Sequence, residues 1–291
     1  MSFTSEIKNT FRNGSTLIRL IYVNVGIFLL VGLPMTLMYL YNKNNDFSVW
    51  LSMPAYLGGL AAKPWTLITY MFFHTGIWHL LFNMLFLYWF GTIFMQFMNG
   101  KLLLKVYLLG GILGGIFFFA AYNIFPVFLT EYYRTGLLGA SAAAMAVMIA
   151  ATVLVPDFTV SLFLVWRVKL KYIALFLVVL DIMTIQQNEN PGGHISHLGG
   201  ALFGYIFMVL YKKQIDITTW MNPLIDLPAR LFTRKPKMKV TYKRPVSDFE
   251  YNKQKNDDTK ELDRILDKIK ASGYDGLTKE EKDFLFRQSK K

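Results

Sequence analysis

The chain has 291 residues, of which 54% are hydrophobic and 17% charged, and its mean hydropathy is +0.34. These values lie outside the range of an ordinary soluble domain and indicate a membrane protein. The absence of cysteine excludes disulfides and thiolate metal sites. The formal net charge of +12 comes mostly from the C-terminal tail and from short loops between apolar runs, a pattern that fits membrane orientation better than binding to nucleic acid.

Six stretches are apolar and long enough to cross the hydrocarbon core, which takes about 20 residues of helix. The first begins near Leu17, is too long for a signal-peptide core and is followed by no cleavage site, so we expect a retained span. The sequence therefore predicts an all-α integral membrane protein. The stretches are 20–42, a span within 64–100, 106–130, 135–156, 172–188 and 190–211.

Lysine and arginine residues flank these spans unevenly. Because cytoplasmic loops carry the excess of these residues, we expect both termini in the cytoplasm, in a bacterial inner membrane, with spans two, four and six entering from the outer face. Ten basic residues lie on the inner side, namely Lys8, Arg12, Arg19, Lys101, Lys105, Arg167, Lys169, Lys171, Lys212 and Lys213, against Lys43, Lys63 and Arg134 on the outer side.

The second span opens with HTGIWHLLFN, residues 74–83. His79 and Asn83 are four residues apart, so they share one helix face and could both donate hydrogen bonds to one bound atom. The equally weighted alternative is that the pair only bonds neighbouring helices. His74 is expected where the helix begins, in a structural role that holds the entry segment.

The fourth span opens with GLLGASAAAMAV, in which Ser141 follows Gly136 and Gly139. Small residues allow a neighbouring backbone to come close, and a glycine-bent helix start leaves N–H groups that can hold an anion. A lone serine in a membrane helix more often bonds its own helix backbone. The case for a nucleophile at Ser141 therefore depends on a histidine at the same depth.

The sixth span contains HISHLGGALFG, residues 194–204. His197, Gly200 and Gly204 line one helix face, and the glycines allow close packing on the Ala-rich fourth span, which would bring His197 within reach of Ser141. His194 lacks this glycine register. Asp181, the only carboxylate within the spans, could orient an imidazole, pair with His194 or line a watery cleft.

A nucleophile, a base of near-neutral pKa and donors for an oxyanion are what acyl transfer requires. With these motifs in this order, residues 15–213 resemble the rhomboid family of intramembrane serine proteases. The motifs are H-x4-H-x3-N, G-x-S-x and H-x2-G-x3-G, on spans two, four and six. The resemblance implies a six-helix bundle that cleaves other membrane proteins with a Ser-His dyad, in a water-filled cavity open to the outer side.

Carried over by this resemblance, Ser141 is the nucleophile and His197 the general base. The backbone N–H of Ser141 and the side chains of His79 and Asn83 would form the oxyanion hole. The resemblance requires no cofactor and no metal. The supporting residues are His74, Gly139, Gly200 and Gly204.

The chain departs from the family pattern at three places. Thr66 stands where an Arg often follows Trp in the first loop, and Met95 with Gln96 stands where a Glu often lies. Met145 replaces an aromatic residue that often stacks on the catalytic imidazole. None of these changes removes a reacting group; they concern loop anchoring, helix-end contacts and the orientation of the imidazole.

The chain divides into four expected parts: a cytoplasmic N-terminus at 1–16, the membrane domain at 17–213, a basic segment and linker at 214–255, and a helical hairpin at 256–291. Residues 230–244 hold seven Lys or Arg and no acid, which favours contact with anionic lipid. In the hairpin, Thr278 and Glu281 form a capping-box pattern. The alternative is a partly disordered tail.

The expected function is that of a serine endopeptidase that hydrolyses peptide bonds in or near transmembrane helices of other proteins. One rival is a catalytically silent rhomboid-like protein that binds membrane clients, against which the intact Ser141 and His197 argue. A second is a transporter or metal-binding membrane protein that uses the four histidines. The sequence has no HExxH motif to support this rival, and the rival leaves the G-x-S-x turn unexplained.

The charge asymmetry predicts the side of the membrane on which the tail lies. A protease added to intact cells should spare the residues after Lys213, whereas inverted vesicles should lose them, as read by immunoblotting of a C-terminal epitope. Digestion of the tail from outside intact cells would refute this topology.

Overall fold

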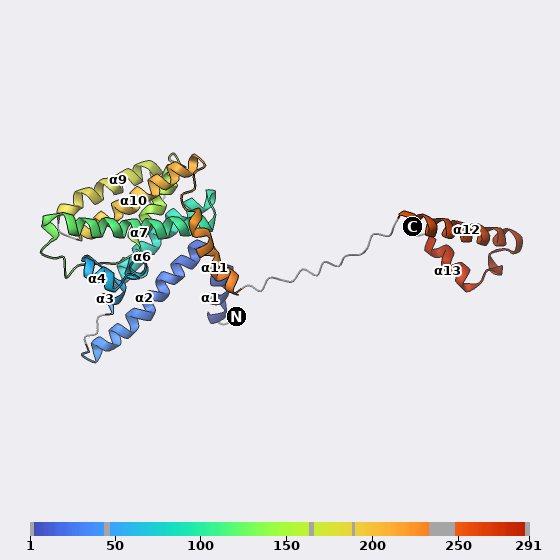
Figure 1. Ribbon diagram of the computed structural model, residues 1–291, viewed down its shortest axis with the longest axis horizontal. Helices are drawn as coiled ribbons and strands as arrows, with labels where there is room; N and C mark the ends of the chain where they lie inside the picture. The colour runs from blue at the N-terminus through green and yellow to red at the C-terminus, as the bar shows by residue number, and fades with distance from the viewer. Residues whose placement is uncertain (1–2, 44–46, 163–165, 188–189, 233–247, 289–291) are drawn as a thin grey trace. The chain divides into compact units, whose positions relative to one another are not determined.

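The computed structural model describes residues 3–43, 47–162, 166–187, 190–232 and 248–288 (Figure 1). The chain separates into two compact units, Met1–Phe232 and Thr233–Lys291. Within the described residues, five helices are long and apolar enough to cross a membrane. They are α2 (Thr16–Leu40), α6 (Ile77–Phe97), α7 (Gly100–Ile124), α9 (Leu170–Thr184), which a short 3-10 turn extends, and α10 (Pro191–Lys212).

The fourth expected span is shorter than the sequence predicted. Helix α8 (Ser141–Leu154) has 14 residues, or roughly 21 Å at 1.5 Å per residue, against a hydrocarbon core of about 30 Å. Residues 136–140 are not helical, because they pair with the first loop instead. The all-α membrane bundle is confirmed, with Ser141 at the very start of its shortest membrane helix.

Short elements connect these helices. Two antiparallel pairs of strands were not expected: β1 (Met53–Pro54) with β2 (Gly136–Leu137), and β3 (Thr159–Leu162) with β4 (Trp166–Lys169). The remaining helices of the first unit are α1 (Phe3–Asn13), α3 (Ser48–Leu51), α4 (Leu57–Ala62), α5 (Thr66–Thr69), α11 (Asn222–Phe232) and the 3-10 turns Tyr70–Phe72, Pro126–Phe128, Ile185–Gln187 and Thr219–Met221.

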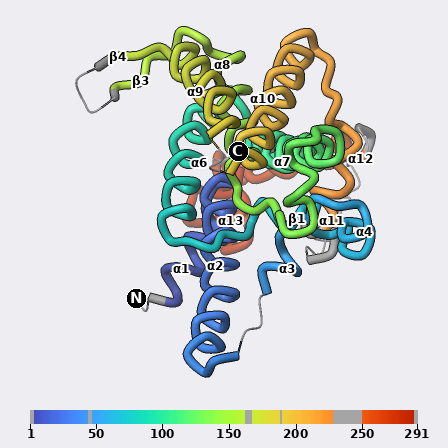
Figure 2. The backbone as a smooth tube through the Cα atoms, turned by 90° about the vertical axis from the view of Figure 1, so that its left-hand side faces the viewer, coloured from blue at the N-terminus to red at the C-terminus, as the bar shows by residue number. Residues whose placement is uncertain are grey.

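Helix α8 is the core of the membrane unit. All its residues from Ala142 to Thr152 are buried, and α6, α7, α9 and α10 contact it. Helix α9 runs beside α10 (Figures 1 and 2) but has only three buried residues, Leu170, Ala174 and Asp181. The centre of the bundle is therefore tightly packed, whereas its α9 side faces outward.

Glycines explain the close packing around α8. A Cβ atom at Gly200 would overlap the carbonyl group of Ala142, and one at Gly204 would overlap that of Ala146. A Cβ at Gly110 of α7 would collide with the Ala146 side chain from another direction. The approach of α10 to the Ala-rich helix, expected from the +3 and +7 spacing, is present in the structure.

The first loop is fixed to α7 by buried tyrosines. The Tyr70 hydroxyl donates to the Gly111 carbonyl oxygen at 2.5 Å, and the Tyr107 hydroxyl donates to that of Met71 at 3.0 Å. The second bond satisfies a carbonyl group of the 3-10 turn Tyr70–Phe72, and polar backbone outside α-helices needs such partners at membrane depth, where no water is available. The segment that leads to His74 is thereby held in place.

The loop is also anchored where the family's Arg is missing. Thr66 is buried and donates to the Lys63 carbonyl oxygen at 2.6 Å. Lys63 Nζ donates to the Val49 carbonyl oxygen at 2.6 Å, and Trp65 Nε1 donates to that of Trp50 at 2.9 Å. Lysine and tryptophan side chains thus tie this loop to α3 without an arginine.

The second unit contains α12 (Asp248–Ser272), a 3-10 turn at Tyr274–Gly276 and α13 (Lys279–Gln288). Glu281 accepts the Thr278 N–H at 2.8 Å, as a capping box requires, and accepts from Lys268 Nζ at 2.9 Å. The Lys268 ammonium lowers the pKa of the Glu281 carboxyl to about 2. Helix α12 begins eight residues earlier than expected, and the basic segment 230–244 lies almost wholly outside the described residues.

The glycine contacts predict that the stability lost on substitution differs from one glycine to another. Gly204→Val should destabilise the membrane unit, by roughly 1–3 kcal/mol as for other overpacked cores, because the new side chain meets backbone atoms of Ala146 that cannot move aside. Gly32→Val in α2, where a Cβ would find nothing within 4 Å, is the matched control. Thermal unfolding in detergent, followed by tryptophan fluorescence, measures both; equal midpoints would contradict the packing argument.

Candidate active site

A cavity of about 370 Å³ lies among α6, α8, α9 and α10. Ser141, His197, His79 and Asn83, which the sequence singled out from three separate spans, all line it. The other lining residues are Phe82, Phe86, Leu138, Met145, Leu177, Leu180, Asp181, Asn190 and Gly193. The fold therefore brings the four expected reacting and stabilising groups into one cavity.

Ser141 is the first residue of α8, after a sharply turned segment. Gly139 has φ +106°, which side-chain-bearing residues rarely adopt, and a Cβ there would lie 2.7 Å from the His79 ring. The Ala140 N–H donates to His74 Nε2 at 3.2 Å. His74 therefore holds the turn before the serine, while the Ser141 N–H faces the start of the helix, where no intrahelical acceptor exists.

His79 and Asn83 lie on the cavity side of α6. Asn83 Nδ2 donates to the His79 carbonyl oxygen one turn earlier, at 2.8 Å. Because an amide nitrogen carries two protons, this bond orients Asn83 and leaves one donor for a second partner. The ring of His79 covers Gly139, two residues before Ser141. Both side chains are thus placed beside the start of α8.

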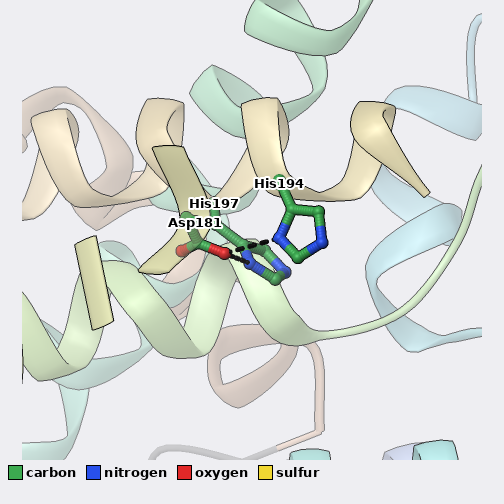
Figure 3. Close-up of side chains that lie close together, drawn as sticks. All are labelled: Asp181, His194 and His197. Atoms are coloured by element: carbon green, nitrogen blue, oxygen red, sulfur yellow. Dashed lines mark hydrogen bonds and ion pairs between the residues drawn. The ribbon is translucent and has the colours of Figure 1, made fainter. Parts of the chain in front are cut away.

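One carboxylate oxygen holds both histidines of α10 (Figure 3). Asp181 Oδ1 lies 2.9 Å from His197 Nδ1 and 2.8 Å from His194 Nδ1. Thr184 Oγ1 is a further neighbour of His194 Nδ1, at 3.3 Å. Asp181 thus pairs with His194, which was one alternative left open by the sequence, and it also bonds His197 and lines the cavity.

The contact with Asp181 determines which nitrogen of His197 is available. A neutral imidazole carries one proton, and a carboxylate at Nδ1 holds that proton there. Nε2 is then left with a lone pair that can accept a proton. Sequence reasoning did not commit to this contact, and the signal that could have revealed it is the single acid in an otherwise uncharged span.

Met145 lies one turn after Ser141 and takes the place of the family's stacking aromatic residue. It is buried, with 5% of its surface exposed, and lines the cavity that His197 also lines. A flexible thioether can pack against a ring, but it fixes the plane of that ring less strictly than an aromatic face does. In this chain, the bond to Asp181 supplies the orientation.

Comparison with known proteins gives matches to both units. The rhomboid domain model matches residues 61–214, and a family of unknown function (DUF6576) matches residues 247–291. The chain is 32% identical over 156 residues to RHOMBOID-like protein 12, mitochondrial, of Arabidopsis thaliana, covering 51% of this chain and 46% of the relative. It is 30% identical over 168 residues to Presenilin-associated rhomboid-like protein A, mitochondrial, of Danio rerio, covering 57% and 42%.

A third relative is Rhomboid-like protein 16, chloroplastic, of Arabidopsis thaliana, at 25% identity over 189 residues, covering 61% of this chain and 58% of the relative. The chain spans about half the length of these curated relatives. Their names refer to mitochondria and chloroplasts, so they give no support to the bacterial membrane expected from the sequence.

Proposed function

The chain belongs to the rhomboid family, and from this membership and the lining of its cavity we propose that it is an intramembrane serine endopeptidase. It is a multi-pass membrane protein with five long apolar helices and one short one in the described residues. The observation that carries the proposal is that Ser141 and His197 line the same cavity as His79 and Asn83. Its substrates would be transmembrane segments of other proteins, cleaved in or near the bilayer.

In the proposed reaction, Ser141 Oγ attacks the scissile carbonyl carbon while His197 Nε2 accepts the hydroxyl proton. The imidazolium then donates this proton to the leaving amine, and an acyl-enzyme remains. His197 next takes a proton from water, which attacks the ester carbonyl carbon. The imidazolium then returns this proton to Ser141 Oγ as the C–O bond breaks and the second product leaves. Asp181 acts through His197 as a positioning residue, because its contact with Nδ1 keeps the accepting lone pair on Nε2 and stabilises the imidazolium.

The start of α8 would stabilise the oxyanion of the tetrahedral intermediates. The Ser141 N–H belongs to the positive end of the helix dipole, and His79 and Asn83 line the cavity beside it. Donors fixed in advance in a site shielded from bulk water are the strongest single contribution to many acyl transfers. The turn at Gly139 supports this geometry, since it sets the direction of the first helical N–H group.

The lining of the cavity favours an apolar substrate. Phe82 and Phe86 come from α6, and Leu177 and Leu180 come from α9, so both of these helices contribute apolar side chains to the walls. The polar groups come from all four helices: His79 and Asn83 on α6, Ser141 at the start of α8, Asp181 on α9, and Asn190 and His197 at α10. An apolar peptide segment can therefore contact the walls while its backbone carbonyl reaches the polar groups. The rival of a silent client-binding protein leaves this polar cluster without a use.

The dyad is tested with four variants: Ser141→Ala, His197→Ala, the double variant and His194→Ala. Both single dyad variants should lose at least about 10³-fold in turnover and lose fluorophosphonate labelling, and the double variant should be little worse, because the two residues act as a unit. His194→Ala should keep measurable activity. The measurement is cleavage of a single-span substrate in liposomes at matched amounts of folded protein.

Activity retained in Ser141→Ala would overturn the serine protease proposal. Activity retained in His197→Ala but lost in His194→Ala would assign the base to the other histidine instead.

The oxyanion hole is tested at α6. His79→Ala and Asn83→Ala should each lower kcat by about 10²-fold, the loss typical of one missing donor, with KM changed much less. Single-turnover kinetics on the same liposome substrate measure this split. If kcat were unchanged in both variants, the pair would serve only to bond neighbouring helices.

A further inference from the structure

His194 has no part in the proposed proton transfers, yet it is held as closely as the proposed base. Asp181, His194 and His197 each offer one possible ligand atom, and these three atoms all lie within 4.8 Å of one another. The Nδ1 atoms of both rings turn toward the same carboxylate oxygen, Asp181 Oδ1 (Figure 3). The second oxygen, Asp181 Oδ2, is buried and has no hydrogen-bond partner among the described residues. This carboxylate therefore has more acceptor capacity than the two histidines use.

The donor set is one that a transition metal recognises. Two imidazole nitrogens and one carboxylate oxygen are typical ligands of Zn²⁺, with bonds near 2.0–2.2 Å, which place tetrahedral donors about 3.4 Å apart. The contacts of 2.8 and 2.9 Å from Asp181 Oδ1 to His194 and His197 would have to lengthen by only about half an ångström. Three protein ligands beside a cavity leave the fourth position for water.

We propose that Asp181, His194 and His197 bind a divalent transition-metal ion, best matched by Zn²⁺, and that the bound ion switches off proteolysis. The site stands on its own geometry, whereas the inhibitory role rests on the proposed function. The site joins α9 to α10, because His194 and His197 are three residues apart on one face of α10 and Asp181 lies on α9 opposite them.

Inhibition follows from the proton count of His197. A metal bound at Nδ1 takes the lone pair of that nitrogen, so the single proton of the neutral imidazole must lie on Nε2. An Nε2–H group cannot accept the proton of the Ser141 hydroxyl. The same ion also coordinates the Asp181 oxygen, which then no longer accepts a hydrogen bond from His197. The metal-bound and proton-accepting states therefore exclude each other, without any covalent change or net proton uptake.

Metal binding is tested first in the full-length Ser141→Ala protein in detergent, which retains all three ligands. Equilibrium dialysis against Zn²⁺ with metal analysis should give one bound ion per chain. Asp181→Asn and His194→Gln should each weaken binding by at least about 10-fold, since even outer-shell changes cost that much. His79→Gln, a histidine of the same cavity outside the cluster, is the matched control and should bind normally.

A spectroscopic measurement on the protein with all three ligands avoids dependence on the folding of the ligand variants. Co²⁺ added to the Ser141→Ala protein should develop the intense visible bands of a low-coordinate site, and Zn²⁺ should displace it. A spectrum that stays that of hydrated Co²⁺, or Zn²⁺ binding that is equal in Asp181→Asn, His194→Gln and His79→Gln, would overturn the site.

The inhibitory role is tested in the protein with Ser141 intact. Zn²⁺ should stop cleavage and a chelator should restore it, and His194→Gln should raise the half-inhibitory Zn²⁺ concentration at least about 10-fold. Ligand-dependent Zn²⁺ binding with cleavage unaffected would overturn the inhibition. Ligand-dependent binding in a protein that shows no Ser141-dependent cleavage would overturn the proposed function and leave the metal site standing.

Discussion

Polar backbone groups within a membrane must find partners inside the protein, because hydrocarbon offers none. The start of α8 depends on this constraint, since residues 136–140 are not helical and precede a helix too short to cross the bilayer alone. Strand β2 pairs with β1, the Gly139 N–H donates to the Tyr70 carbonyl oxygen at 2.9 Å, and the Ala140 N–H donates to His74. The first loop, fixed to α7 by its tyrosines, is thus a scaffold for the position of Ser141.

The same constraint explains where small and polar residues lie in the bundle. Glycines on α10 let its backbone touch that of α8, which removes the space that lipid or water would fill. Polar side chains from four helices meet at the cavity, where Asp181 bonds His197 and Asn83 bonds a carbonyl oxygen of its own helix. The close packing of α10 on α8 and the polar cavity at the start of α8 are therefore parts of one arrangement.

Much of this could be read from the sequence, because it depends on spacing along single helices. The apolar stretches, the face shared by His79 and Asn83, and the glycine register after His197 are all local patterns with a fixed geometric meaning. The start of α8 at Ser141 could not be read, since it depends on pairing of the preceding residues with the distant segments Met53–Pro54 and 70–74. The division of Asp181 between two histidines likewise depends on how α9 packs against α10, which no local pattern specifies.

Helix α9 has few buried residues, and one of them is Asp181. The helix that forms an outward wall of the cavity is therefore also the helix that carries the carboxylate for His197. An outward movement of α9 that widened the cavity for a bulky segment would draw this carboxylate away from the imidazole. Its return would restore the bond only after the segment was seated. If the proposed mechanism holds, access to the cavity and orientation of the base would then be coupled, and the widest state of the cavity would be its least reactive.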